Sequence, residues 1–160
     1  MIKVSKGLDL PISGKPLPNI SDHPKSNNVA LLGNDFIGMK PTMLAKEGDM
    51  IKVGDKLFED KKNPGIFYTA PAGGIIKSIN RGDKRKFLSL EIEISSNENF
   101  KEFDLGNSPN EIKSALVESG LWNAFRTRPF NRTPKIDDLP SAIFINCCDT
   151  NPLSIDPHEI

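Results

Sequence analysis

The chain has 160 residues, and its 21 lysine and arginine side chains balance its 21 aspartate and glutamate side chains, so the formal net charge is zero. Proteins that bind nucleic acids usually carry a basic excess, because phosphate contacts supply most of their affinity, so the composition argues against that class. No run approaches the ~20 apolar residues that cross a bilayer, and Met1–Gly7 has no apolar signal-peptide core. We therefore expect a cytoplasmic chain, which could still lie against a membrane partner.

Residues 1–28 are predicted to form an ordered N-terminal arm. Leu8, Leu10 and Ile12 alternate with an aspartate and a proline, a pattern typical of an edge strand that tolerates proline. Further prolines keep the backbone extended after this stretch, at Pro16, Pro18 and Pro24.

Residues 29–96 are predicted to form a small β module. Gly-Asp pairs begin at Gly48, Gly54 and Gly82, and each follows a short segment with alternating apolar residues. Glycine permits the positive φ of a tight turn, and aspartate hydrogen-bonds to its own backbone there. The first and third pairs lie 34 residues apart, as if one hairpin unit were used twice. Strands are expected over 29–32, 66–69, 75–79 and 87–94.

Residues 97–139 are predicted to form a helical linker and a basic loop. The sequence Ser108-Pro109-Asn110-Glu111 is a capping box with proline at the first helical position. Apolar residues then follow with helical spacing until Gly120, where the helix is expected to stop. Arg126–Arg132 contains three arginines and a phenylalanine, which makes it a basic, aromatic-bearing loop.

Residues 140–160 are predicted to begin a truncated α/β domain. The apolar run Ala142–Asn146 is typical of a buried first strand. A single strand of this kind cannot bury both faces alone, so we expect the chain to be the N-terminal part of a longer protein. The adjacent Cys147 and Cys148 match no disulfide or metal-site spacing and are expected to be reduced and partly buried.

The order of turns and strands resembles the biotinyl and lipoyl carrier fold, a flattened barrel of two similar halves. The matching stretches are Glu47-Gly48-Asp49, Val53–Leu57, Ala70–Gly73 and Gly82-Asp83. The predicted fold class is therefore α+β, mainly β: a barrel-sandwich hybrid followed by a helical linker and the first strand of an α/β domain.

Carrier domains present a modified lysine on the turn before the Ala-Pro strand, flanked by methionines. Counting back from Ala70 places Asn63 where that lysine stands, and neither Lys61 nor Lys62 has a methionine neighbour. The resemblance therefore extends to the fold but not to the modified lysine, and we expect no covalent modification.

Nearly the whole chain also resembles the N-terminal region of the A subunit of the sodium-translocating NADH:quinone oxidoreductases. The resemblance rests on several unusual strings in one order: 6–12, 29–33, 38–43, 57–65, 80–82, 119–122, 126–130 and 149–153.

This resemblance implies a peripheral subunit on the cytoplasmic side of the bacterial inner membrane. The family complex oxidises NADH, reduces ubiquinone and pumps sodium ions outward. Its NADH, flavins, iron–sulfur centres and ubiquinone are used by the complex as a whole, so no cofactor is expected on this chain. The implied partners are other subunits, especially a membrane-embedded one. The chain alone is expected to have no catalytic residues and no metal site.

Two segments are candidates for contact with quinone. The first contains Phe36, Gly38 and Met39, and it is apolar and made flexible by glycine. The second contains Arg126, Arg128 and Phe130. Arginine offers planar donors that suit a quinone carbonyl, while the apolar side chains could cover the ring. We predict that the two segments approach each other and form a quinone-contacting or membrane-subunit-facing surface.

Three functions remain open from the sequence. The chain could be a docking part of the redox complex that also contacts quinone, an unmodified structural interaction module, or a biotin or lipoyl carrier domain. The composition of the turn at Asn63 argues against the carrier. No nucleotide-binding fingerprint follows a strand, and His23 and His158 lie in proline-containing loops without a nucleophile motif.

Overall fold

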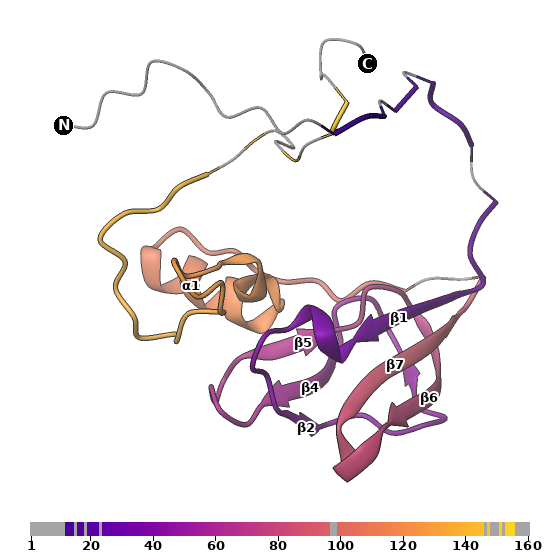
Figure 1. The fold of residues 1–160 in the computed structure, drawn as a ribbon. Helices are drawn as coiled ribbons and strands as arrows, with labels where there is room; N and C mark the ends of the chain where they lie inside the picture. Colours follow the sequence, from indigo (N-terminus) through magenta and orange to yellow (C-terminus); the bar gives the residue numbers. More distant parts are fainter. Residues whose placement is uncertain are drawn as a thin grey trace. The chain divides into compact units, whose positions relative to one another are not determined.

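The computed structural model describes residues 12–14, 16–17, 19–22, 24–96, 99–145, 147, 151 and 153–155. Contacts divide the chain into two units, Lys25–Leu139 and a second unit made of Met1–Pro24 and Pro140–Ile160. All the helices and strands of the described residues belong to the first unit (Figure 1). The predicted edge strand of the N-terminal arm lies outside the described residues except for Ile12, which is exposed.

The first unit contains two antiparallel sheets. One has the strand order β1-β7-β6-β3 and the other β2-β4-β5. The strands are β1 (Asn28–Leu32), β2 (Pro41–Met43), β3 (Met50–Ile51), β4 (Lys56–Asp60), β5 (Phe67–Thr69), β6 (Gly74–Arg81) and β7 (Phe87–Ile94). Short 3-10 turns follow β1 and β6, at η1 (Gly33–Asp35) and η2 (Asp83–Arg85). The predicted mainly β character is thus confirmed.

The first two Gly-Asp turns share one geometry. Gly48 and Gly54 have φ of 88° and 91°, in the left-handed region that glycine adopts at no steric cost. In each turn the aspartate Oδ2 accepts a hydrogen bond from the backbone N–H three residues earlier, at 2.8 Å for Asp49 and 2.7 Å for Asp55. Gly82 is different, because its φ is −97° and its aspartate begins η2. The repeat of this turn therefore stops at the second copy.

The hydrophobic core contains side chains from both sheets. Its largest fully buried members are Leu57, Phe58, Ile66, Ile76, Leu90 and Ile92. Two consecutive residues of β4, Leu57 and Phe58, are both buried, although strand residues normally alternate between faces. The pairing of β4 with β5 shifts register between Lys56 and Phe58. Such an irregularity changes the direction of a side chain, which lets both Leu57 and Phe58 be buried.

The linker contains α1 (Pro109–Glu118) and η3 (Leu121–Ala124). The predicted capping box is confirmed, since Ser108 Oγ accepts from the Glu111 N–H while Glu111 Oε2 accepts from the Ser108 N–H at 2.8 Å. Gly120 follows the helix with a left-handed φ of 79°, as expected for a stop.

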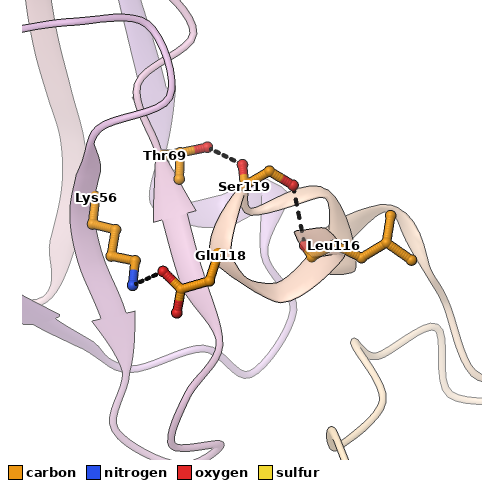
Figure 2. A network of polar contacts seen from close by, with 5 residues as sticks. All are labelled: Lys56, Thr69, Leu116, Glu118 and Ser119. Atoms are coloured by element: carbon orange, nitrogen blue, oxygen red, sulfur yellow. Dashed lines mark hydrogen bonds and ion pairs between the residues drawn. The ribbon is translucent and has the colours of Figure 1, made fainter. Parts of the chain in front are cut away.

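The segment after α1 attaches to β5, an edge strand whose other side pairs with β4. Figure 2 shows Thr69 Oγ1 donating to the Ser119 carbonyl at 2.9 Å and Lys56 Nζ lying 2.6 Å from Glu118 Oε2. The Asn123 side chain donates to the Phe67 carbonyl at 2.6 Å. The Phe67 carbonyl is a backbone group that an edge strand otherwise leaves unpaired. The other two contacts are made by side chains of β4 and β5, and together the three fix the linker to the barrel.

The predicted strand over Ala142–Asn146 is not formed in the described residues 142–145, and Asn146 lies outside them. The exposed fractions of Ile143, Phe144 and Ile145 are 63%, 93% and 84%. A strand needs a neighbour to receive its backbone hydrogen bonds, and none of the described residues supplies one here. The expected burial is also wrong for Cys147, which is exposed, and Cys148 lies outside the described residues.

Candidate functional site

A cavity of about 220 Å³ opens where three segments of the first unit meet. One wall is Phe36–Met39, which follows η1, and a second is the turn after β4. The third is the loop after η3, through Arg126 and residues 131–133 and 135, and Tyr68 of β5 also lines the space. The cavity thus lies where the barrel meets the linker.

The two segments that the sequence singles out lie at this one cavity. Phe36, Gly38, Met39 and Arg126 line it. Arg128 and Phe130 do not, and Phe130 has 72% of its surface exposed.

The loop that carries these two residues closes on itself, which explains their position. The Thr127 N–H donates to the Arg132 carbonyl and the Asn131 N–H donates to the Thr127 carbonyl, each at 2.8 Å. The residues between form an exposed tip, and the chain returns to the cavity at Arg132.

Asp60 ties two of the walls together. Its side chain is buried, and Oδ1 accepts hydrogen bonds from the backbone N–H groups of Lys40 and Lys62, both at 3.0 Å. Two further bonds link the same walls: the Lys61 N–H donates to the Lys40 carbonyl and Lys62 Nζ donates to the Gly38 carbonyl, both at 2.8 Å. Burying a carboxylate costs free energy unless it is hydrogen-bonded in this way. Because one of its hydrogen bonds comes from Lys40, the residue after Met39, Asp60 also holds Phe36–Met39 in place.

Tyr68 brings a phenol to the cavity. Its ring stacks on Phe58, with centroids 4.8 Å apart, and meets the edge of Phe36 at 4.5 Å. Burial, and secondly the negative charge of Asp60, raise the pKa of Tyr68 to about 12. A hydrogen bond from Thr133 and the positive charge of Arg126 act in the opposite direction but do not cancel this rise. The hydroxyl therefore keeps its proton at neutral pH and can donate a hydrogen bond.

Arg126 is held by neutral acceptors. Its Nη1 donates to the carbonyls of Asn123 and Phe125, the latter at 3.1 Å, and to Thr133 Oγ1 at 3.2 Å. Guanidinium has five N–H donors, so others remain for a ligand. The planar group is thus oriented before any ligand arrives.

The turn at Asn63 is covered by the loop after η3. Asn63 Nδ2 donates to the Pro134 carbonyl at 3.2 Å, and Trp122 Nε1 donates to the same carbonyl at 3.0 Å. Gly65 has a φ of 86°, in the left-handed region that favours glycine, and a Cβ there would lie 2.7 Å from Ile136 Cδ1, so the Ile136 side chain packs directly on this turn. The position that bears the lysine in a carrier therefore packs against the chain instead of projecting into solvent.

Sequence reasoning missed most of the polar lining, because Asp60, Tyr68 and Thr133 carry no local pattern. Tyr68 is the one residue with a usable indication, since an aromatic side chain in the middle of a predicted strand is expected on its buried face. Arg132 ends the basic loop that the sequence does identify, but its position depends on the closure of that loop.

A family model described as the NqrA N-terminal barrel-sandwich hybrid domain matches residues 2–95, more than half of the chain. The chain belongs to the NqrA family. The match confirms the predicted barrel-sandwich hybrid and the resemblance found from the sequence. A second model, the NqrA second alpha/beta domain, matches residues 107–160, so within the NqrA family α1 and the basic loop fall in the second domain.

Three curated relatives are the A subunits of Na(+)-translocating NADH-quinone reductases. Those of Actinobacillus pleuropneumoniae serotype 5b and Klebsiella pneumoniae are 48% identical to this chain, and that of Yersinia pestis is 49% identical, each over 166 residues. Each alignment covers all of this chain, which spans about 37% of the length of these relatives. In the part of this chain that the structure describes, no helix is both long and apolar enough to cross a membrane.

Tyr68 is the only tyrosine in the sequence, so phenolate absorbance reports it directly. We expect its titration midpoint in the folded protein at about 12, whereas the ordinary pKa of a tyrosine is 10.0. Because the folded state holds this proton more tightly than the unfolded chain, Tyr68 contributes stability below pH 10 that is lost as the pH rises towards 12. Tyr68→Phe should remove that part of the pH dependence. A midpoint near 10 in the folded protein would contradict the buried position.

The covered turn predicts that the protein from its native host is unmodified. Asn63 replaces the carrier lysine, and the neighbouring lysines lie on a turn that is bonded to the rest of the chain. Intact-mass measurement checks this. An added lipoyl or biotinyl mass on Lys61 or Lys62 would favour the carrier function.

Proposed function

We propose that this chain is the docking part of a peripheral subunit of a sodium-translocating NADH:quinone reductase complex on the cytoplasmic side of the bacterial inner membrane. The complex would oxidise NADH, reduce ubiquinone and export sodium ions. Membership of the NqrA family supports this role, and the names of the relatives describe that activity for their own complexes. NADH, flavins and iron–sulfur centres would belong to other subunits, including a membrane-embedded partner.

Within that role we propose that the cavity contacts the quinone headgroup. The observation that carries this proposal is the presence of two donors, the Tyr68 hydroxyl and the oriented Arg126 guanidinium, beside the apolar side chains of Phe36 and Met39. A quinone ring has two carbonyl acceptors and two apolar faces. The donors suit the carbonyls, and the apolar side chains suit the ring.

Gly38 and the tip of the loop have separate roles in this proposal. Gly38 gives its carbonyl to Lys62 and thereby fixes the apolar wall. Arg128 and Phe130 are outside the cavity, so we assign them to the docking surface, where arginine and aromatic residues are enriched. A chain that docks without contacting quinone would use the same tip but would not need the cavity.

Kinetics of the whole complex can separate these roles. Phe36→Ala or Arg126→Gln should raise the quinone KM by about tenfold, which corresponds to the loss of roughly 1.4 kcal/mol per contact. NADH oxidation by an artificial acceptor should stay normal, because that reaction does not use the cavity. Lys77→Gln is the matched control and should leave the quinone KM unchanged, because Lys77 lies on β6 and does not line the cavity.

Two results would count against quinone contact. One is normal quinone turnover by assembled complexes that carry Phe36→Ala and Arg126→Gln. The other is an equal rise of the KM in the Lys77→Gln control. Either result would leave docking as the function of this part of the chain.

A further inference from the structure

Positive charge is concentrated at the cavity. Its lining contains four cationic side chains, Lys62, Arg126, Arg132 and Lys135, but only one carboxylate, Asp60. The chain as a whole has a formal net charge of zero. The surplus at the cavity is therefore a local arrangement and does not reflect a basic composition.

Among the residues that the structure describes, none of these four cations has an acidic partner. The ion pairs within that part of the chain join Lys56 to Glu118 and Lys113 to Asp137. Asp60 does not serve as counter-charge within 4.0 Å, and its Oδ1 already accepts two backbone N–H groups.

The contacts that two of the cations do make are with neutral oxygens. Lys62 Nζ donates to the Gly38 carbonyl, and Arg126 Nη1 donates to two carbonyls and to the Thr133 hydroxyl. These bonds orient the charges without neutralising them.

Like charges that converge on one concave site repel each other, and because all four side chains are exposed, water and salt screen part of this repulsion. Such an arrangement attracts anions, and a bound anion offsets the repulsion. A neutral quinone would not need Arg132 or Lys135, since Tyr68 and Arg126 already supply donors for its two carbonyls.

The rest of the lining limits the kind of anion. Phe36 and Met39 give one apolar wall, and the Tyr68 ring packs against Phe36. The cavity volume of about 220 Å³ is small for a ligand site, which commonly exceeds ~300 Å³. The space therefore suits one ring or one headgroup and not an extended molecule.

We infer that this cavity binds an organic anion, a phosphate or carboxylate carried on a small flat or apolar body. Arg126, Arg132 and Lys135 hold the anionic group from the side of the loop, and Lys62 holds it from the turn after β4. Phe36 and Met39 cover the apolar body. This inference goes beyond quinone contact, because it assigns a charged ligand and uses cations that a quinone does not require.

Titration calorimetry on the full-length protein tests the inference with phenyl phosphate, inorganic phosphate and phenol as probes. Phenyl phosphate should bind most tightly, because it alone offers both the charge and the ring. Its affinity should fall as salt is added. Arg132→Gln and Lys135→Gln should each weaken it by about threefold to tenfold, as expected for the loss of one charge-assisted contact. Lys77→Gln is the matched control, since Lys77 lies on β6 and does not line the cavity.

A second arm identifies the source of the anion. Vesicles of phosphatidylcholine with phosphatidylglycerol are compared with vesicles of phosphatidylcholine alone. The cavity is assigned to a lipid headgroup if the protein binds only the vesicles with phosphatidylglycerol, if phenyl phosphate competes with this binding, and if Lys135→Gln abolishes it. Binding of phenyl phosphate without vesicle binding assigns it to a soluble anion. Both outcomes support an anion site.

The inference is overturned if phenol binds as tightly as phenyl phosphate, or if Lys77→Gln weakens binding as much as Lys135→Gln. A neutral short-chain ubiquinone analogue titrated in parallel separates this failure from that of the proposed function. If the protein binds the quinone analogue but shows no specific binding of phenyl phosphate, only the anion site is refuted. Retained anion binding without quinone binding refutes only the quinone contact.

Discussion

The buried carboxylate of Asp60 is the interaction on which the candidate site depends. One oxygen accepts the N–H groups of Lys40 and Lys62 and thereby holds the apolar segment Phe36–Met39 against the turn after β4. The same carboxylate adds to the rise in the pKa of Tyr68, which burial causes in the first place. Without Asp60, two backbone N–H groups beside the barrel would lose their acceptor, at a cost of roughly 1–3 kcal/mol each if they stayed buried. The position of one wall of the cavity therefore rests on a single side chain.

The same turn is where this carrier-like barrel differs from the pattern of a carrier. In a carrier the turn must project so that a modified lysine can move between partners. In this chain Asn63 is bonded to Pro134 and Gly65 packs closely against Ile136. The linker that covers the turn is itself fixed to β5 through Thr69 and Phe67. The loop after η3 thus makes the turn a wall of the cavity, and we expect no modified lysine there, so the fold alone does not predict the function.

Local chemistry explains which parts of this structure could be predicted from the sequence. The capping box at Ser108 and the turns at Gly48 and Gly54 form because a few neighbouring residues satisfy their own backbone groups. The roles of Asp60 and Tyr68 depend on residues far away in the sequence, so no short pattern reveals them. The strand expected at Ala142–Asn146 needed a partner that the described residues do not provide. Arg128 and Phe130 lie outside the cavity because the loop closes between Thr127 and Arg132, a closure that no short sequence pattern reveals.

The central claim is that the loop after η3 covers the turn at Asn63 and so creates the cavity. Nuclear Overhauser effects in the isotopically labelled protein test it most directly, because they report proton pairs that lie close together. The account predicts cross-peaks between the Ile136 δ methyl group and the α protons of Gly65, since the structure brings these groups into contact. Cross-peaks between the rings of Phe58 and Tyr68 serve as the internal control for a folded core. If the core cross-peaks are present and those between Ile136 and Gly65 are absent, the turn is uncovered and the account is contradicted.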